Sequence, residues 1–321
     1  MATGEQIKSL IQSYFDKNEE RFKTTVLQLA ASEAKRGHNN LAREIRDLVD
    51  KVKCNSNKIV NFNKELNELI ISNITNHRLS ELVVPNEIKK RVERILKEFK
   101  QQSKLKKHGF TNRRKILLVG PPGTGKTMTA AIFASEINLS LCTILMDKLV
   151  TKFMGETSAK LRQIFESINE NQGVYFFDEF DAIGSERSLE NDVGEMRRVL
   201  NTFLKFIEQD NSNSLIVAAT NNPRLLDQAL FRRFDDILHY KLPSEPEIKK
   251  LILNRIGKYA SQTLPTESII KEANSLSHAE IACACDDAIK ESILNDKPKV
   301  DETLLLTMLN ERKSVYHREE H

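Results

Sequence analysis

The chain is poor in cysteine, and the few cysteines it has form no recognised pattern. Cys54, Cys142, Cys283 and Cys285 are the only four, and no two of them make a CxxC pair. The sequence therefore predicts neither a disulfide framework nor a zinc site. Scattered, unpaired cysteines suit a reducing compartment, so we expect a cytoplasmic protein.

Long apolar runs are missing as well. No run approaches the roughly 18 apolar residues that a membrane-spanning helix needs. Near the amino terminus, Lys8, Gln12 and Asp16 interrupt the first apolar residues, which is unlike the apolar stretch of a signal peptide. We therefore expect no signal peptide and no membrane partner.

A strong charge of one sign is also lacking. The 49 Lys and Arg residues exceed the 45 Asp and Glu residues by only 4, which is too little to predict nucleic-acid binding. The densest basic run, KEFKQQSKLKKH at residues 97–108, is typical of a solvated helix face. A track along a phosphate backbone is the less favoured alternative, and we expect no nucleic-acid partner.

The 321 residues are enough for two or three compact units, and the first of these is helical. Apolar residues recur at helical spacing within 7–15, 22–30 and 41–52. Residues 1–54 are therefore predicted to form a three-helix bundle that docks a partner, with packing inside an oligomer as the alternative. Residues 55–78 are rich in Asn and are interpreted as a linker with one short helix at Glu65–Ile71.

Residues 79–242 alternate between helices and apolar strands. A helix is predicted over 86–107, and strands are predicted at 115–119, 141–145, 174–177, 215–220 and 236–240. Short strands that are apolar on both faces, with helices between them, predict an α/β fold with a parallel five-stranded sheet flanked by helices. The strands stop after Pro243, and residues 243–321 are predicted to form a small all-helical unit.

A phosphate-binding motif opens one of these helices. GPPGTGKT, residues 120–127, has the pattern G-x-x-x-x-G-K-T and directly follows the KILLV strand, and this context makes the pattern specific. Its glycines let backbone N–H groups wrap phosphates at a helix N-terminus. Lys126 would contact the β- and γ-phosphates of ATP, and the Thr127 hydroxyl would ligate Mg²⁺. The predicted nucleotide-binding residues of this segment are Pro121, Pro122, Gly123, Thr124, Gly125, Lys126, Thr127 and Met128.

An acidic pair ends a second apolar strand, in VYFFDEFD. Two adjacent carboxylates at the end of a buried strand are costly without a cation, which favours a functional pair. Asp178 would hold Mg²⁺, mostly through water, and Glu179 would orient and deprotonate the attacking water. The pair predicts ATP hydrolysis rather than nucleotide sensing, whereas Asp181 is better explained as a helix cap.

Taken together, these motifs resemble the AAA+ ATPases over residues 79–295, in order along the chain. LLVGPPGTGKT, YFFDEFDAIG and AATNNPRLLDQALFRRFD resemble the nucleotide motifs of that family and its second region of homology. The resemblance implies that Asn221 is a polar sensor near the γ-phosphate. It also implies that Arg232 and Arg233 are arginine fingers, which reach the ATP of a neighbouring subunit in a ring, usually a hexamer. The two arginines are adjacent, which resembles the katanin, spastin and Vps4 group of single-ring remodellers.

The same resemblance assigns further residues to the nucleotide site. Leu82 and Val83 align with the segment that covers the adenine, and an ordinary core role is the alternative. LSHAEIACACDDA resembles the second sensor helix of the family's helical lid, which would place His278 and Ala279 near the nucleotide. His278 stands where a small residue is common, so a role in helix capping or packing is an equal alternative.

A short apolar stretch, KFMGET at residues 152–157, raises the question of a substrate contact. Alone, Phe153 and Met154 would be interpreted as the end of a buried strand. The family carries its first pore loop at this place, as an aromatic residue, a hydrophobic residue and a glycine. By this resemblance, Phe153, Met154 and Gly155 would line a central channel and grip an extended protein chain, with Met supplying an adaptable surface.

The resemblance therefore implies a Mg²⁺-dependent ATPase that remodels, unfolds or threads protein substrates as a homo-hexamer. The core looks like small bacterial AAA ATPases paired with a subtilisin-like protease, some of them linked to phage defence, and the bundle resembles microtubule-interacting-and-trafficking modules. An ATP-dependent switch or scaffold for a partner enzyme, without threading, is the alternative. A nucleic-acid machine is disfavoured by the near-neutral net charge of +4.

Overall fold

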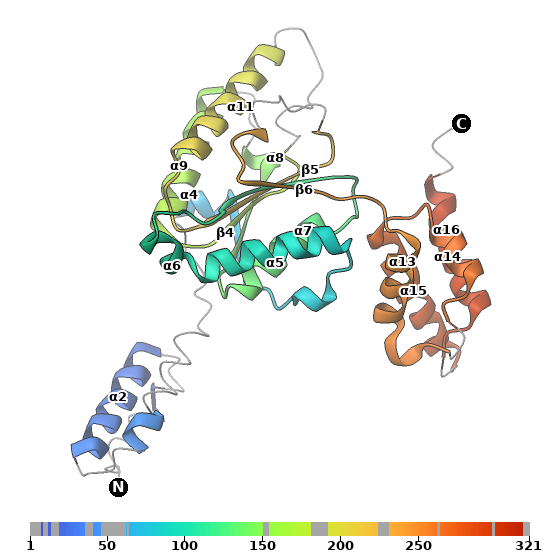
Figure 1. The fold of residues 1–321 in the computed structure, drawn as a ribbon, viewed down its shortest axis with the longest axis horizontal. Coiled ribbons are helices and arrows are strands. Elements are labelled where there is room, and N and C mark those ends of the chain that lie inside the picture. Colours follow the sequence, from blue (N-terminus) through green and yellow to red (C-terminus); the bar gives the residue numbers. More distant parts are fainter. Residues whose placement is uncertain are drawn as a thin grey trace. The chain divides into compact units, whose positions relative to one another are not determined.

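The computed structural model describes residues 8, 12–13, 19–35, 41–45, 62, 64–149, 154–180, 192–223, 231–261, 264–296 and 299–316. Contacts divide the chain into two units, Met1–Lys58 and Ile59–His321 (Figure 1). In the first unit, helix α2 (Glu19–Lys35) lies where the second bundle helix is predicted, and its Ala30 is buried. Residues 41–45 are also helical, while most of the first and third predicted helices lies outside the described residues.

The second unit, Ile59–His321, is built on a six-stranded sheet. Its elements up to the last strand are α4 (Lys64–Asn67), β1 (Ile70–Asn73), the short 3₁₀ helix η1 (Leu79–Glu81), α5 (Asn86–Lys100), α6 (Gln102–Lys107), β2 (Lys115–Val119), α7 (Lys126–Glu136), β3 (Leu141–Ile144), α8 (Met146–Leu149), α9 (Met154–Glu170), β4 (Val174–Phe177), α11 (Asp192–Gln209), β5 (Leu215–Thr220) and β6 (Asp236–His239). Then follow α13 (Glu245–Ile256), η3 (Gly257–Tyr259), α14 (Glu267–Ala273), α15 (His278–Leu294) and α16 (Glu302–Tyr316). Of the helices that the structure describes, none is both long and apolar enough to span a membrane.

The strand order is β1-β3-β4-β5-β2-β6, and every pairing among β2 to β6 is parallel. All five predicted strands are present, with β3 and β6 each ending one residue earlier than predicted. The prediction of an α/β fold with these five strands in parallel is therefore confirmed. Parallel pairing follows because each run is apolar on both faces and needs a helix to cover each face.

The predicted count of five strands is wrong, because β1 adds a sixth. It pairs antiparallel with β3, with Ile70 opposite Ile144, in a segment that the sequence predicts to be a linker with a helix over Glu65–Ile71. Helix α4 ends at Asn67 instead. Leu69 and Ile70 are only 4% and 2% exposed, so burial against the sheet outweighs the local preference for helix.

The helix predicted over 86–107 is divided into two. Gln101 has φ −109° and ψ 19°, so α5 ends before it and α6 begins after it. α5 places Val92, Ile95 and Phe99 in the core at helical spacing, whereas α6 buries none of its residues. The apolar face that anchors α5 therefore stops at the point where the helix ends.

Side chains of the strands alternate between two cores, one on each face of the sheet. In β2, Leu117 and Val119 join the cluster formed with α9 and α11. Ile116 and Leu118 join the cluster formed with α5 and α7. Figure 1 shows these two pairs of helices on opposite sides of the sheet. Helix α7 begins at the phosphate motif. Its position is therefore fixed by packing against one face of the sheet.

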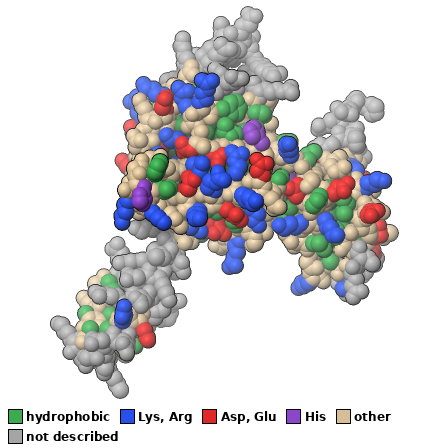
Figure 2. All heavy atoms as spheres, in the orientation of Figure 1, with side chains coloured by type: hydrophobic (Ala, Val, Ile, Leu, Met, Phe, Trp, Pro, Cys, Tyr) green, Lys and Arg blue, Asp and Glu red, His purple; other side chains and the backbone are tan. Residues whose placement is uncertain are grey.

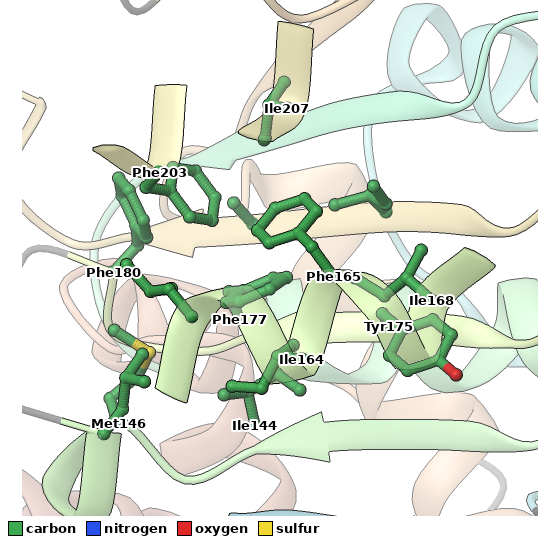
Figure 3. Packing of buried hydrophobic residues seen from close by; sticks show 14 of the residues in the cluster. Ile144, Met146, Ile164, Phe165, Ile168, Tyr175, Phe177, Phe180, Phe203 and Ile207 are labelled. Atoms are coloured by element: carbon green, nitrogen blue, oxygen red, sulfur yellow. The ribbon is translucent and has the colours of Figure 1, made fainter. Parts of the chain in front are cut away.

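Aromatic side chains fill the core between the sheet and the helices α9 and α11 (Figure 3). The ring centroid of Phe165 lies 6.1 Å from that of Phe177 and 5.8 Å from that of Phe203. Phe177 and Phe203 meet edge to face at 5.1 Å. Each such pair adds about 0.5–1.5 kcal/mol to the effect of burial. Because Phe177 directly precedes Asp178, this cluster fixes the place where β4 ends.

The C-terminal helices α13 to α16 have a hydrophobic core of their own, in which Ile252 of α13 is buried. Capping boxes start two of these helices, with Ser244 and Glu247 at α13 and with Ser277 and Glu280 at α15. The second box fixes the start of α15, where the Ala279 N–H donates to the Gly123 carbonyl at 3.0 Å.

The aromatic cluster predicts a large stability effect for Phe165→Ala. The ring is surrounded by Phe177, Phe203 and Phe206, so its removal leaves a cavity and should cost about 3–5 kcal/mol of unfolding free energy. Urea denaturation followed by circular dichroism measures this. Phe110→Ala is the matched control, because Phe110 is 66% exposed and its loss should change the free energy by less than about 0.5 kcal/mol. Equal losses in the two variants would contradict the packing described here.

Candidate functional site

The candidate functional side chains lie at one edge of the sheet, where three neighbouring parallel strands end. β5 lies between β2 and β4, and Thr220 of β5 is paired with Val119 of β2. Because the carboxyl ends of parallel strands meet at the same edge, the segments that follow the three strands converge. The phosphate motif, Asp178 and Asn221 come directly after these strands.

A cavity of about 900 Å³ opens at this edge and reaches the C-terminal helices. Its volume is within the range of sites for small molecules. Fourteen of the predicted site residues line it: Leu82, Val83, Pro122, Gly123, Thr124, Gly125, Lys126, Thr127, Met128, Asp178, Glu179, Asn221, His278 and Ala279. The fold therefore brings to one place residues that the sequence analysis selected from five separate segments.

Glycines give the phosphate loop a shape that other residues would not tolerate. Gly123 and Gly125 have φ of 70° and 97°, in the left-handed region that residues with a side chain rarely adopt. A Cβ at Gly120 would lie 2.8 Å from the Cβ of Tyr240, which is too close for any other residue. The backbone can therefore curl tightly before α7, so that N–H groups at the helix N-terminus are placed to bind an anion.

Lys126 is a buried cation at the centre of this loop. It is 6% exposed, and its Nζ donates to the carbonyl oxygens of Gly120 and Pro121, both at 2.8 Å. The Thr124 hydroxyl donates to the same Pro121 carbonyl at 2.7 Å. A buried ammonium group at a helix N-terminus concentrates positive charge, which suits the phosphates of a nucleotide.

The C-terminal helices touch the phosphate loop directly. The backbone N–H of Ala279, in the first turn of α15, donates to the Gly123 carbonyl at 3.0 Å. A Cβ at Gly123 would collide with the Ser277 hydroxyl and lie 3.2 Å from the Ala279 Cβ. Gly123 therefore permits both the turn of the loop and the close approach of α15.

Thr127 and Asp178 provide the oxygen ligands that a magnesium ion needs. The Thr127 hydroxyl donates to Asp178 Oδ2 at 3.0 Å, and Asp178 Oδ1 accepts the Glu179 backbone N–H at 3.0 Å. Magnesium usually takes one or two protein oxygens together with phosphates and waters. The described residues contain no group of three or more His, Cys, Asp or Glu that could hold a metal. The site therefore fits a magnesium ion shared with a nucleotide rather than one caged by protein alone.

Glu179 has an unusual backbone conformation. Its φ is 50°, a value that is uncommon outside glycine and often found at functional sites. The next residue, Phe180, is buried, and its N–H donates to the Ala219 carbonyl of β5 at 2.8 Å. This bond holds the turn in place, and the exposed side chain of Glu179 lines the cavity, as Asn221 does.

Apolar side chains and a histidine line a further part of the cavity. Leu82 and Val83 are buried there. Burial lowers the pKa of His278 below its usual value, so the imidazole is neutral at pH 7. Both ring nitrogens are shielded from solvent and make no hydrogen bond of normal geometry among the described residues, although the Val83 backbone is a polar neighbour of the ring. Shielded nitrogens beside apolar walls match the polar edge and flat face of a nucleotide base.

Residues 116–242 match the model of a known family, the ATPase family associated with various cellular activities (AAA). The chain is also 30% identical over 309 residues to the uncharacterized AAA family ATPase y4kL of Sinorhizobium fredii, across 94% of this chain and 93% of the relative. This chain belongs to the AAA family of ATPases. It is therefore an enzyme that hydrolyses ATP with Mg²⁺, as the motifs predict.

Other relatives match this AAA ATPase over a smaller part of their length. A proteasome-activating nucleotidase of Methanococcus vannielii is 33% identical over 211 residues, which cover 63% of this chain and 52% of the relative. The ATP-dependent zinc metalloprotease FtsH 2 of Thermoanaerobacter sp. is 29% identical over 203 residues, which cover 61% of this chain and 40% of the relative. The chain therefore spans about half the length of such relatives or less.

Three residues predicted for nucleotide binding and catalysis do not line the cavity. Pro121 contributes its carbonyl oxygen, which accepts hydrogen bonds from Lys126 and Thr124. Arg232 is exposed, and the Nε of Arg233 donates to Glu208 Oε2 at 3.3 Å. The assignment of both arginines as fingers stays a prediction, because fingers would act on a neighbouring copy.

The predicted pore loop can be placed only in part. Phe153 lies outside the described residues, and Met154 is the first residue of α9, with its side chain also outside them. β3 ends at Ile144, and α8 comes between that strand and α9. Residues 154–157 are helical, so the alternative that this part of KFMGET ends a buried strand is wrong. Lys152 and Phe153 lie outside the described residues, and contact with a substrate stays a prediction.

Sequence reasoning missed part of the cavity lining. His77 and Glu81 lie on one part of the wall, where His77 Nδ1 is 2.9 Å from Glu81 Oε2 and the contact lowers the pKa of Glu81. Asn254 and Arg255 of α13 lie on another part, and Arg255 makes two hydrogen bonds to Asp286, at 2.6 and 2.5 Å. No sequence motif marks these residues. For Asn254 and Arg255, the one usable signal was that α13 is the first helix after the last strand.

Lys126→Ala is expected to abolish tight nucleotide binding. Removing a buried cation from its anionic ligand should cost about 2–5 kcal/mol, so the Kd for ADP should rise by a factor of about 30 or more. Isothermal titration calorimetry measures the change. Lys107→Ala is the control, because Lys107 is exposed on α6. An unchanged affinity in Lys126→Ala would contradict the phosphate-binding site.

Glu179→Gln is expected to separate binding from turnover. The amide keeps the shape of the side chain but cannot accept a proton, so kcat should fall by about 10²–10⁴ while the Kd for ATP stays within about threefold. Phosphate release and direct titration measure the two quantities. Glu170→Gln, at the exposed end of α9, is the control. Normal turnover in Glu179→Gln would show that Glu179 is not the residue that takes the proton.

Proposed function

We propose that this AAA ATPase forms a ring of six copies and uses ATP hydrolysis to remodel, unfold or thread protein substrates through a central pore. One observation supports the proposal of an oligomer. The cavity contains the phosphate loop, both carboxylates and Asn221 of one chain, but neither Arg232 nor Arg233 of that chain. Arg255 lines the cavity but is bound to Asp286, so the further cations that stabilise the charge of phosphoryl transfer would come from a neighbouring copy.

Each polar group of the cavity has a role in this proposal. Lys126 binds the β- and γ-phosphates, and Thr127 and Asp178 hold Mg²⁺, which supplies charge neutralisation when bound. Glu179 orients the attacking water and takes its proton. Asn221, at the end of β5, keeps that water in line with the γ-phosphate.

The contact between α15 and the phosphate loop links hydrolysis to motion. The Ala279 N–H bonds to the carbonyl of Gly123, so the C-terminal helices, the lid of this proposal, are tied to the loop that holds the phosphates. Loss of the γ-phosphate changes the charge that the loop must balance, and the lid position changes with it. Such a lid would transmit each turnover to the next copy in the ring.

A protein substrate is supported by the stretch KFMGET and by the relatives. Phe153 and Met154 would stand at the start of α9 in every copy and form rings of apolar side chains around the pore. Two relatives carry names that link them to the proteasome and to proteolysis. An apolar, adaptable grip suits extended chains of many sequences.

The proposal extends to a partner and a setting. The bundle predicted over residues 1–54 would dock that partner, and a subtilisin-like protease in bacterial defence, within the cytoplasm, is the one that the resemblance suggests. An ATP-dependent switch or scaffold for a partner enzyme would use the same nucleotide residues. Such a switch or scaffold would differ from a threading ring in one respect only: it would hydrolyse ATP without threading a substrate.

The surface does not favour a nucleic-acid machine. On the face shown in Figure 2, Lys and Arg side chains are interspersed with Asp and Glu. In the unit Ile59–His321, Arg91 is paired with Asp236, and Arg113 is paired with Glu98. Cations that are already paired contribute little to binding a phosphate backbone.

A mixing experiment tests whether the active site lies between copies. A variant with Arg232→Ala and Arg233→Ala should bind ATP normally but lose about 10³-fold or more in hydrolysis. Mixed with Glu179→Gln, it should regain activity, because some interfaces then pair an intact Glu179 with intact arginines from the neighbour. The readout is phosphate release by the mixture against the two variants alone. A mixture as inactive as its parts would rule out arginines acting between copies.

Phe153→Ala tests the pore. It should hydrolyse ATP at the wild-type rate and fail to unfold a tagged fluorescent protein, because the chain would lose its aromatic grip. Phe153→Tyr, which keeps an aromatic ring, should still unfold the reporter. If the wild-type protein hydrolyses ATP without unfolding any tagged reporter, the switch alternative is supported. If Phe153→Ala unfolds the reporter normally, the side chain has no part in threading.

A further inference from the structure

Tyr240 lies directly beneath the phosphate loop and is not part of the cavity. It follows the last residue of β6, and its backbone N–H donates to the Val119 carbonyl at 2.6 Å. Val119 is the residue before Gly120, where the loop begins. The side chain of Tyr240 is only 3% exposed, and neither it nor Thr129 lines the cavity. Tyr240 therefore cannot act on a nucleotide by touching it.

The backbone of Tyr240 holds the first residue of the loop. A Cβ at Gly120 would collide with the Tyr240 carbonyl oxygen and lie 2.8 Å from the Tyr240 Cβ. Gly120 itself is tied to β5 through its N–H, which donates to the Thr220 carbonyl at 3.2 Å. The start of the loop is therefore clamped between the ends of two strands.

The hydroxyl of Tyr240 holds the other end of the loop. Its oxygen lies 2.6 Å from the hydroxyl oxygen of Thr129, which is in the first turn of α7 and has no exposed surface. Thr129 has one hydroxyl proton and donates it to the Gly125 carbonyl at 3.0 Å. Tyr240 must then be the donor to Thr129. A chain of two hydrogen bonds thus runs from Tyr240 to the residue before Lys126.

Both ends of the loop therefore meet at one residue, Tyr240, one end at its backbone and the other at its hydroxyl. The loop is also closed on its inner side, where Lys126 Nζ donates to the Gly120 carbonyl. Burial raises the pKa of the Tyr240 hydroxyl far above its usual value, so the donor is present at every working pH. A buried, fully paired chain of this kind rigidifies what it connects.

We propose that Tyr240 is a positioning residue of the ATPase, which fixes the separation between the two ends of the phosphate loop and so raises affinity for nucleotides without contacting them. The loop must present its N–H groups in one arrangement to wrap phosphates, and a loop that is held in advance loses less freedom on binding. The proposal rests on the ATP hydrolysis shown by family membership and does not depend on the ring or on the substrate.

Tyr240→Phe tests this inference, because it removes the hydroxyl and keeps the ring. The Kd values for ATP and for ADP should rise by the same factor, about 3- to 10-fold, which is what one lost hydrogen bond produces. KM should rise in parallel while kcat is unchanged, as expected when uniform binding is lost. Titration calorimetry and steady-state phosphate release measure these quantities.

Tyr175→Phe is the matched control. Tyr175 is also fully buried in the sheet, and its hydroxyl donates to the carbonyls of Ser167 and Asn171 at 3.2 and 2.9 Å, away from the cavity. Both variants should melt at a lower temperature than the wild type, but only Tyr240→Phe should bind nucleotides more weakly. Equal Kd values for Tyr240→Phe and Tyr175→Phe would show that Tyr240 is an ordinary core residue, and would overturn the proposal.

Substitutions at Thr129 test the chain from its other end and apply even where Tyr240→Phe does not fold. Thr129→Val should raise the Kd as Tyr240→Phe does, and Thr129→Ser, which keeps the hydroxyl, should restore wild-type affinity. Combining Thr129→Val with Tyr240→Phe should add nothing to the larger single effect, because both break the same chain. Additive effects of the two substitutions on the Kd would contradict a role through this chain of hydrogen bonds. So would a Thr129→Ser variant that binds nucleotides as weakly as Thr129→Val.

Discussion

The contact between Gly123 and the start of α15 is the constraint on which the nucleotide site depends. One hydrogen bond, from the Ala279 N–H to the Gly123 carbonyl, joins the C-terminal helices to the phosphate loop. No residue with a side chain could take the place of Gly123, since its Cβ would collide with the Ser277 hydroxyl. The cavity exists because these two parts of the chain close on each other at that point.

The sheet supplies the other half of the site. β2, β4 and β5 end at the same edge, and each is followed by a segment with a distinct chemistry: a loop that binds anions, a carboxylate pair and an amide. The aromatic core behind β4 fixes where that strand ends, and so places the partly buried Asp178 and the exposed Glu179 at the cavity.

Much of this arrangement could be predicted from the sequence, because its signals are local. Strands such as 115–119 and 215–220 are short and apolar on both faces, and GPPGTGKT lies directly between a strand and a helix. The strand β1 could not be predicted, because Ile70–Asn73 becomes a strand only by pairing with β3. Asn254 and Arg255 were missed for the same reason, since α13 reaches the cavity only through the fold.

In the function proposed for this ATPase, the site of one chain is completed by a second copy. The most direct measurement is the rate of ATP hydrolysis per chain across a dilution series that runs from assembled protein to single chains, with the assembly state followed by analytical ultracentrifugation. The account predicts that the rate per chain falls steeply as the assembly dissociates, because Arg232 and Arg233 leave the neighbouring site. A rate per chain that stays constant down to the single chain would contradict it.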